Sequence, residues 1–159
     1  MAFEITQTRS IEDFEACANL MYNSDPWITL GMNFNDCIVA FEGNHRQIFV
    51  LKEKSKNQIE GFIIIQPQGT FKGYIQTICV SESCRGKGYG TLLLQFAENN
   101  ILTYSPNVFI CVSSFNQKAL ALYIKLGFEL VGELPNFVKA GFTELLLRKS
   151  KGPIAGYIN

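Results

Sequence analysis

A glycine-rich segment in the middle of the chain constrains the fold more than any other feature of the sequence. It runs Val80-Ser-Glu-Ser-Cys-Arg85-Gly-Lys-Gly88-Tyr-Gly90-Thr91 and connects a strand-like run, 74–80, to a helical pattern that begins near Gly90. Amide N–H groups in such a turn and in the first helical residues have no acceptor within the helix and lie at the positive end of its dipole. Glycines let the backbone approach an anion closely and take positive φ values. The segment therefore predicts a strand-to-helix turn that can bind phosphate oxygens.

Spacing excludes two common nucleotide-binding motifs. A dinucleotide fingerprint would need a third glycine where Thr91 or Leu93 stands. A Walker A loop would need a glycine in place of Ser81, and Ser or Thr in place of Gly88. What remains is the pattern Arg85-x-x-Gly-x-Gly, directly after an apolar strand.

The composition is typical of one globular domain with a net charge close to zero. The chain has 159 residues, of which 47% are hydrophobic and 18% charged, and 14 Lys and Arg residues balance 14 Asp and Glu residues. This predicts a single domain over 1–159, with a loose C-terminal tail over 149–159. The balance gives no reason to expect binding to nucleic acid or to an anionic membrane, although a local basic patch stays open. Because the N-terminus lacks a leader pattern and no apolar run could span a bilayer, we expect a cytoplasmic protein.

The five cysteines fit a reducing compartment. Their number is odd and no two of them form a Cys-x-x-Cys pair, so the sequence predicts neither a disulfide framework nor a metal site. Those on or beside apolar strands are explained as small core residues. Cys84, beside the glycine turn, could be accessible, but it lacks a histidine partner that would make it a nucleophile.

Periodicity along the chain predicts alternating strands and helices. Strands are expected over 3–9, 48–54, 59–66, 72–80, 108–112, 128–134 and 142–148, and helices from Ser10, from Asn33 or Asn35, from about Gly90 and from Asn116. The run 108–112 is apolar almost throughout, which is typical of a strand buried on both faces and parallel to its predecessor. The sequence therefore predicts a βαβ unit within a mostly antiparallel sheet.

A second segment, 116–128, combines polar and apolar residues on one helical face. Asn116, Ala119 or Leu120, and Tyr123 are spaced so that their side chains can meet one ligand lying along the helix. Taken alone, a tyrosine in an amphipathic helix is more simply explained as a core aromatic with its hydroxyl at the rim. The single tryptophan, Trp27, is likewise explained by core or interface packing, with the lining of a substrate cleft as the alternative.

Together the two segments resemble the Gcn5-related N-acetyltransferase (GNAT) family. Its acyl-CoA-binding signature reads Gln or Arg, two residues, Gly, one residue, Gly or Ala, and Arg85, Gly88 and Gly90 match it. Its later segment reads Asn, two residues, Ala, three residues, Tyr, three residues, Gly-Phe, and 116–128 fills every position. The resemblance covers about two thirds of the chain, 48–149. It implies an α/β acetyltransferase fold, with a central mixed, mostly antiparallel sheet of about six or seven strands flanked by about four helices.

The resemblance also implies an activity. Family members transfer an acetyl group from acetyl-CoA to a primary amine by direct attack, which makes Tyr123 the candidate general acid for the leaving thiolate. A backbone N–H near Cys79 or Val80 would stabilise the oxyanion, and no metal is involved. The implied cofactor-binding residues lie on the fourth strand, the glycine turn and the last helix: Ile78, Cys79, Val80, Arg85, Gly86, Lys87, Gly88, Tyr89, Gly90, Thr91, Asn116, Ala119 and Tyr123.

The sequence leaves the general base and the acceptor open. Where some family members carry a catalytic glutamate, this chain has Tyr74 on the fourth strand and Cys111 on the fifth. Deprotonation could use ordered water, a substrate of lower pKa, or a carboxylate elsewhere; His45 is better explained as a solvated loop residue. The carboxylates considered are Glu42, Glu60 and Glu144. The acceptor could be a peptide N-terminus, a lysine side chain, a polyamine or an amino sugar, and the acyl group could be longer than acetyl.

Three classes of function stay in competition at this point. An acetyltransferase is favoured by both segments, and whether it forms a homodimer is left open. A non-catalytic acyl-CoA-binding or sensing domain of the same fold is favoured by the two missing carboxylates. A nucleotide-binding or phosphate-binding structural protein would fit the glycine turn but would leave the pattern of 116–128 unexplained.

Overall fold

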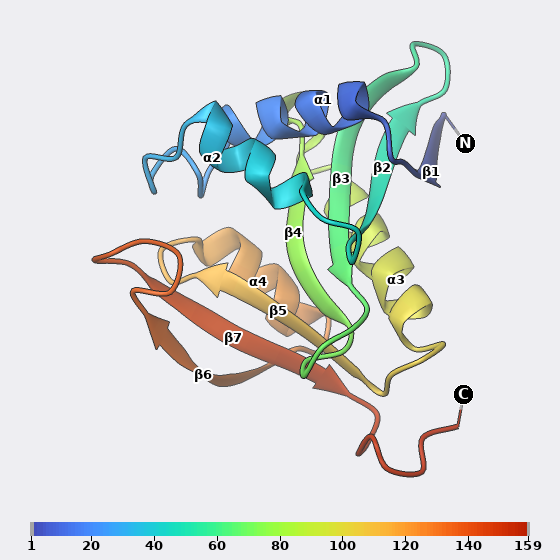
Figure 1. Ribbon diagram of the computed structural model, residues 1–159, viewed down its shortest axis with the longest axis vertical. Helices are drawn as coiled ribbons and strands as arrows, with labels where there is room; N and C mark the ends of the chain where they lie inside the picture. The colour runs from blue at the N-terminus through green and yellow to red at the C-terminus, as the bar shows by residue number, and fades with distance from the viewer. Residues whose placement is uncertain (1, 159) are drawn as a thin grey trace.

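A computed structural model describes residues 2–158 as a twisted sheet with helices on both faces (Figure 1). The elements follow in the order β1 (Phe3–Gln7), α1 (Ile11–Tyr22), α2 (Phe34–Ile38), the 3₁₀ turn η1 (Val39–Phe41), β2 (Gln47–Glu53), β3 (Gln58–Gln66), β4 (Tyr74–Val80), the 3₁₀ turn η2 (Glu82–Cys84), α3 (Tyr89–Ile101), β5 (Asn107–Ser113), α4 (Gln117–Lys125), β6 (Glu129–Pro135) and β7 (Thr143–Ser150). The predicted strands and helices are thus all present. None of the described helices is long and apolar enough to cross a bilayer.

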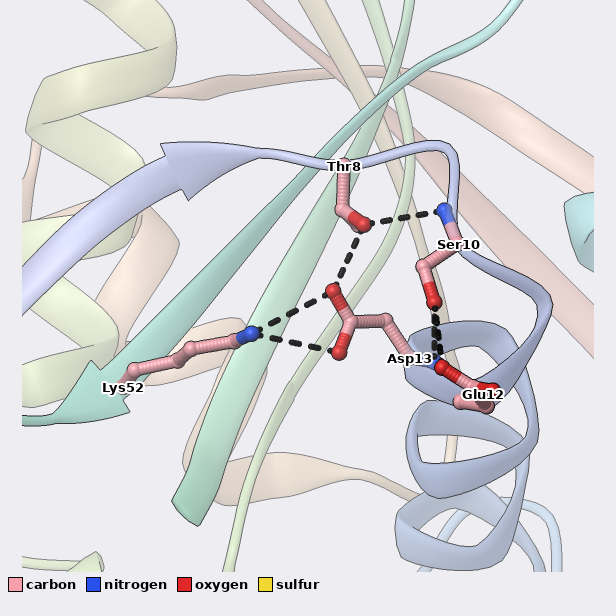
Figure 2. Close-up of polar contacts among 5 residues, drawn as sticks. All are labelled: Thr8, Ser10, Glu12, Asp13 and Lys52. Carbon is pink, nitrogen blue, oxygen red and sulfur yellow. Dashed lines mark hydrogen bonds and ion pairs between the residues drawn. The ribbon is translucent and has the colours of Figure 1, made fainter. Parts of the chain in front are cut away.

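Polar side chains fix the start of α1 against the sheet (Figure 2). Ser10 is the N-cap, as predicted, and its hydroxyl accepts a hydrogen bond from the backbone N–H of Asp13. The Asp13 carboxylate accepts from the Thr8 hydroxyl at 2.6 Å and pairs with the Lys52 ammonium of β2 at 3.2 Å. These contacts connect the β1–α1 turn to the neighbouring strand, so they set how α1 lies on the sheet.

The sheet is antiparallel except at one junction. Its strand order is β1-β2-β3-β4-β5-β7-β6, and β4 and β5 are the parallel pair that the sequence predicts. Only Tyr74 and Ile75 of β4 pair with β5, opposite Phe109 and Ile110. On its other edge β4 pairs with β3 along its whole length, interrupted by a bulge at which Gln76 is the extra residue. β4 and β5 therefore separate after Ile75, where β4 has its bulge, and stay apart toward their carboxyl ends.

Two apolar cores lie on opposite faces of the sheet. One joins α3 and α4 to the sheet through residues such as Ile75, Leu93 and Leu147. The other joins α1 and α2 to β2, β3 and β4 through residues such as Met21 and Phe62. Figure 1 shows that α1 and α2 cover only the β2–β4 part of their face. The same face of β5 and β7 is left without a helix, and it borders the gap between β4 and β5.

The C-terminal strand extends beyond the predicted boundary. We expected it to end at Arg148 and the tail to begin at Lys149, but Lys149 and Ser150 still pair with Val108 and Asn107 of β5. The following segment is also attached, because the Tyr157 hydroxyl donates to the carbonyl of Leu102 at 2.6 Å. The expectation of a loose tail from residue 149 was wrong at its start, since Ser150 still finds a backbone partner in β5.

Candidate functional site

The separation of β4 and β5 creates two adjoining cavities. The larger one, of about 920 Å³, lies between the end of β4, the glycine turn and α4. The smaller one, of about 130 Å³, lies between β4 and β5 on the side of the α1–α2 connection. Tyr123 and Asn116 of the α4 segment line both cavities, as do Trp27 and Ile78. The two spaces therefore meet at the point where the Tyr123 side chain lies.

The larger cavity collects most of the residues predicted to bind the cofactor. All of them line it except Lys87 and Tyr89. Lys87 is exposed outside it, and the ring of Tyr89 packs against Phe3 of β1 with a centroid distance of 4.3 Å. Residues that the sequence analysis did not single out also line it: Asp25, Phe115, Gln117, Lys118, Leu122 and Lys125. Of these, Lys118 and Lys125 lie on the side of α4 roughly opposite to Asn116 and Tyr123 by helical spacing, so the helical face considered from the sequence did not indicate them.

The glycine turn presents backbone donors to the larger cavity. Gly88 is the N-cap of α3 with φ +85°, and no side chain caps the helix. Gly86 also has a positive φ, of +71°, and a Cβ added at either glycine would meet no protein atom within 4 Å. Because both glycines also line the larger cavity, the open space beside them belongs to it. The first N–H groups of α3 are left to bind an acceptor such as a phosphate oxygen.

Arg85 and Cys84 have more restricted roles than their sequence positions indicate. The Arg85 guanidinium donates to the carbonyl of Val80 at 3.2 Å and to the hydroxyl of Ser24 at 2.9 Å, so part of its donor set is used within the protein. Cys84, which could have been accessible, is only 7% exposed. Arg85 thus holds the α1–α2 connection next to the turn while its charge stays at the cavity wall.

The free edge of β4 carries backbone groups that no strand satisfies. Ser81 N–H donates to the carbonyl of Glu60 in β3 at 2.7 Å. N–H groups alternate sides along a strand, so the N–H of Cys79 also faces β3, whereas those of Ile78 and Val80 face the gap. Of the two oxyanion donors suggested by the resemblance, this alternation favours Val80 over Cys79.

Tyr123 is buried where the two cavities meet. Its side chain is 6% exposed, and its ring lies 6.0 Å from that of Phe128. Burial raises the pKa of its hydroxyl, which therefore carries its proton at neutral pH. Asn116 lies about two turns earlier, at the start of the helix, and caps α4 by accepting from the N–H of Ala119 at 3.3 Å. The structure thus combines two explanations that the sequence left as alternatives, because Tyr123 is a core aromatic whose side chain also faces the cavities.

The smaller cavity is built from side chains that are far apart in the sequence. Glu144 of β7 lies opposite Ser113 of β5, and its Oε1 accepts from the Ser113 hydroxyl at 2.6 Å. Glu144 is 6% exposed, and burial raises the pKa of its carboxyl although the Ser113 hydrogen bond opposes the shift. Trp27 packs against the core formed with α1 and α2 and also lines both cavities, so packing and cleft lining, which the sequence left as alternatives, are both present.

Tyr74 and Cys111 also line the smaller cavity, at the positions of the missing carboxylates. Burial raises the pKa of both groups, and the carboxylate of Glu144 adds to the increase in each. In Cys111 a hydrogen bond with Tyr74 acts in the opposite direction. All three side chains therefore belong to one polar cluster at the base of the cavity.

The remaining candidate bases lie elsewhere. Glu42 and His45 are exposed in the segment before β2, and neither lines one of the two cavities. Glu60 is buried, but it points to the β3–β4 end, where its carboxylate accepts from the hydroxyls of Ser81 and Ser83. Of the carboxylates considered from the sequence, Glu144 is the one that the fold brings to the cleft.

Comparison with known sequences identifies the family. A sequence profile described as the acetyltransferase (GNAT) domain matches residues 44–130, more than half of the chain. The chain belongs to the GNAT acetyltransferase family. No curated protein matches the chain. The matched range contains the glycine turn and Tyr123, but Trp27, the β6–β7 loop and Glu144 lie outside it.

Solved structures support the same fold. The ribosomal-protein-S18-alanine N-acetyltransferase of Escherichia coli is similar with a TM-score of 0.74 and 17% identity, over 98% of this chain and 99% of that one. An aminoglycoside 6'-N-acetyltransferase complexed with coenzyme A has a TM-score of 0.70 and 16% identity, over 94% and 98%. A variant of the spermidine N-acetyltransferase of Vibrio cholerae has a TM-score of 0.70 and 15% identity, over 98% and 97%. The predicted family, fold and enzyme class are therefore confirmed.

Proposed function

We propose that this GNAT enzyme transfers an acetyl group from acetyl-CoA to a primary amine by direct attack, with both substrates bound at once. The observation that carries the proposal is the position of Tyr123, whose side chain lines both the larger and the smaller cavity. An acyl donor in the larger space and an amine in the smaller one would meet beside its hydroxyl. That arrangement calls for direct transfer and for no acyl-enzyme intermediate.

The larger cavity suits acetyl-CoA in shape and chemistry. Its volume of about 920 Å³ is within the range of ligand and cofactor sites. The uncapped start of α3 offers N–H donors to the pyrophosphate, and Gly86 and Gly88 leave room for it. The free edge of β4 offers the N–H groups of Ile78 and Val80 to the amide-containing arm. We assign the acyl thioester to the inner end of this cavity, next to Val80 and Tyr123.

The reaction needs a proton removed and a proton supplied. An alkylammonium has a pKa of about 10.4, so its deprotonation at pH 7 costs about 4 to 5 kcal/mol. The leaving thiolate accepts a proton from the Tyr123 hydroxyl, which burial keeps protonated until then. A positioned general acid typically contributes about 10² to 10⁴ in rate. The Val80 N–H is placed to stabilise the negative charge that develops on the thioester oxygen.

The test separates binding from turnover. Thermal melting with acetyl-CoA, CoA, ATP and NAD in parallel should show stabilisation by the two CoA compounds alone, since a ligand at a hundred times its Kd adds about 2.7 kcal/mol. Tyr123→Phe should keep that stabilisation and lower CoA release with an amine by at least about 100-fold. Tyr22→Phe, on the exposed part of α1, is the matched control and should behave as wild type.

The other outcomes identify the competing functions. Stabilisation by CoA without turnover of any amine would favour a non-catalytic acyl-CoA-binding domain, the alternative supported by Tyr74 and Cys111 at the glutamate positions. Stabilisation by ATP or NAD that competes with acetyl-CoA would favour a nucleotide site. The absence of a shift with either CoA compound would overturn the proposed function itself.

A further inference from the structure

The smaller cavity carries one negative charge and no positive one. Among the described residues that line it, Glu144 is the only one with a formally charged side chain. Oε1 of Glu144 accepts from Ser113, whereas no described residue donates to Oε2. Oε2 is not among the fully buried side-chain atoms that lack a hydrogen-bond partner. It is therefore accessible from the open space of the cavity. A carboxylate can accept about four hydrogen bonds, which leaves this one under-satisfied and in need of a donor.

Apolar and aromatic side chains form one part of the cavity wall, and polar side chains such as Thr77 and Asn116 form the rest. Trp27 and Leu30 come from the α1–α2 connection, and Phe137 and Val138 come from the β6–β7 loop. A cationic group beside Glu144 would be paired, and an apolar arm attached to it would lie against these side chains. A carboxylate next to the amine would lie close to the like charge of Glu144, and the nearby Lys139 ammonium is already bound to the carbonyl of Leu30. The lining therefore favours an ammonium group over a zwitterion.

The size of the cavity limits the acceptor. Its volume of about 130 Å³ is similar to that of a cavity of about 150 Å³ that binds benzene. An aminoalkyl end fits this space, whereas a large acceptor would have to leave most of its atoms outside it. The two loops that wall it are joined, because the Lys139 ammonium donates to the carbonyl of Leu30. Figure 1 shows the two loops on the same side of the molecule, where the arm of the acceptor would enter between them.

We propose that the acceptor is a primary alkylammonium on an unbranched arm, without a carboxylate next to the amine, and that Glu144 binds it and removes its proton. The proposal rests on the proposed function and deepens it. Glu144 is located on β7, next to β5, so it serves the cleft from the strand that neighbours Cys111. The chain thereby supplies from β7 a carboxylate that it lacks at Tyr74 and Cys111.

The proton and electron changes balance as follows. The Glu144 carboxylate takes a proton from the ammonium, and the freed nitrogen lone pair forms a bond to the carbonyl carbon of the thioester. The carbon–sulfur bond breaks, the sulfur keeps its electron pair, and the thiolate takes the proton of Tyr123. The nitrogen loses its second proton to the Tyr123 oxygen, and Glu144 returns its proton to solvent. The sum is an N-alkylacetamide, CoA and one proton.

A matched set of amines tests the selectivity. Norvaline is 1-aminobutane with a carboxylate on the carbon that bears the amine, and norvalinamide carries a neutral group of similar size there. With wild type and acetyl-CoA, we expect kcat/KM for 1-aminobutane to exceed that for norvaline at least 100-fold, with norvalinamide between them. Three further acceptors then distinguish the sources of the alkylammonium. They are spermidine, a peptide with an acetylated N-terminus and one lysine, and a lysine-free peptide with a free N-terminus.

Variants test the role of Glu144. Glu144→Gln should lower kcat/KM for 1-aminobutane at least 100-fold, and calorimetry on the CoA complex should show at least tenfold weaker binding of 1-aminobutane. Glu133→Gln, on the exposed β6 strand, is the control and should change neither. Folding is monitored separately: because the pKa of Glu144 is raised in the folded state, its ionised form lowers stability above that pKa. Glu144→Gln should therefore melt no lower than wild type at pH 8.

The outcomes keep the two proposals apart. Norvaline used as well as 1-aminobutane, or Glu144→Gln keeping more than a tenth of wild-type activity with full amine affinity, would overturn the present inference and leave the acetyltransferase function intact. Failure of acetyl-CoA to bind would instead overturn the proposed function. If kcat/KM for norvalinamide were as low as that for norvaline, the size of the added group and not its charge would explain the selectivity. That result would also contradict the present inference.

Discussion

The two cavities that meet at Tyr123 are built in different ways. The larger one depends on backbone: glycines with positive φ, the uncapped start of α3 and the free edge of β4. The smaller one depends on side chains of β4, β5, β7 and two loops. The family profile contains the glycine turn and ends before the β6–β7 loop and Glu144. The difference teaches that backbone geometry shapes the larger cavity, whereas the smaller one also needs side chains from outside the profile, namely those of the α1–α2 connection, the β6–β7 loop and Glu144.

The sharpest test of the backbone cavity is Gly88→Ala. An L-residue at φ +85° costs about 1 to 2 kcal/mol, and the methyl group would also occupy cavity space. We expect acetyl-CoA affinity to fall about thirtyfold, which corresponds to about 2 kcal/mol. Calorimetry with acetyl-CoA measures the loss.

Gly43→Ala is the control for this variant, because Gly43 has φ +93° and also has no atom near its missing Cβ, but it lies outside both cavities. Both variants should lose a similar free energy of unfolding, of about 1 to 2 kcal/mol. Equal loss of acetyl-CoA affinity in the two would show that strain alone is responsible, and would contradict the assignment of the larger cavity.

Ser113→Ala tests the side-chain cavity through its pH dependence. The Ser113 hydrogen bond lowers the pKa of Glu144 against the larger, opposite effect of burial, so its removal should raise that pKa further. Since the base must be ionised, the acid limb of the kcat/KM profile should move to higher pH. The loss should be roughly tenfold at low pH, in line with a hydrogen bond to a charged group of about 1.5 kcal/mol, and should diminish at high pH.

Ser55→Ala removes a similar hydroxyl-to-carboxylate hydrogen bond, to Glu53 at 3.0 Å, in the exposed β2–β3 turn, and should leave the profile unchanged. A uniform decrease at every pH for Ser113→Ala would indicate a purely structural role and would remove the link to Glu144.

The smallest expected effect concerns the joined loops. Lys139→Met removes the ammonium that donates to the carbonyl of Leu30, so the walls of the smaller cavity lose one connection. We expect KM for the amine to rise roughly fivefold, about 1 kcal/mol, while acetyl-CoA affinity stays the same. Lys56→Met, in the exposed turn after β2, is the control. A change in acetyl-CoA affinity would show that the two cavities are not independent.

Local patterns explain why most of the fold could be predicted. Caps such as Ser10 and Asn116, the polar turn after Glu53 and the apolar run of β5 each encode their own element. The glycine turn could be predicted for the same reason, since its residues are contiguous. Lys87 and Tyr89 lie between the glycines of the turn but do not line the cavity: Lys87 is exposed, and the ring of Tyr89 packs against Phe3.

The acceptor side could not be predicted in the same way. Glu144 was one of three carboxylates that no local pattern in the sequence distinguishes. The pairing of β7 with β5 is what brings Glu144, and not the other two, to the cleft. Trp27 has an apolar environment in sequence, but its position at the cleft depends on how the α1–α2 connection meets β4. These are contacts between distant segments, and no spacing rule along one element contains them.

The brevity of the β4–β5 ladder has a consequence for the architecture as a whole. With two residue pairs at this seam, β1–β4 and β5–β7–β6 are nearly two separate sheets joined at one end. An extended acyl donor lying along the open edge of β4 would take the place that a neighbouring strand normally fills. The acyl donor would then act as a missing strand, and the sheet would be complete only while the donor is bound.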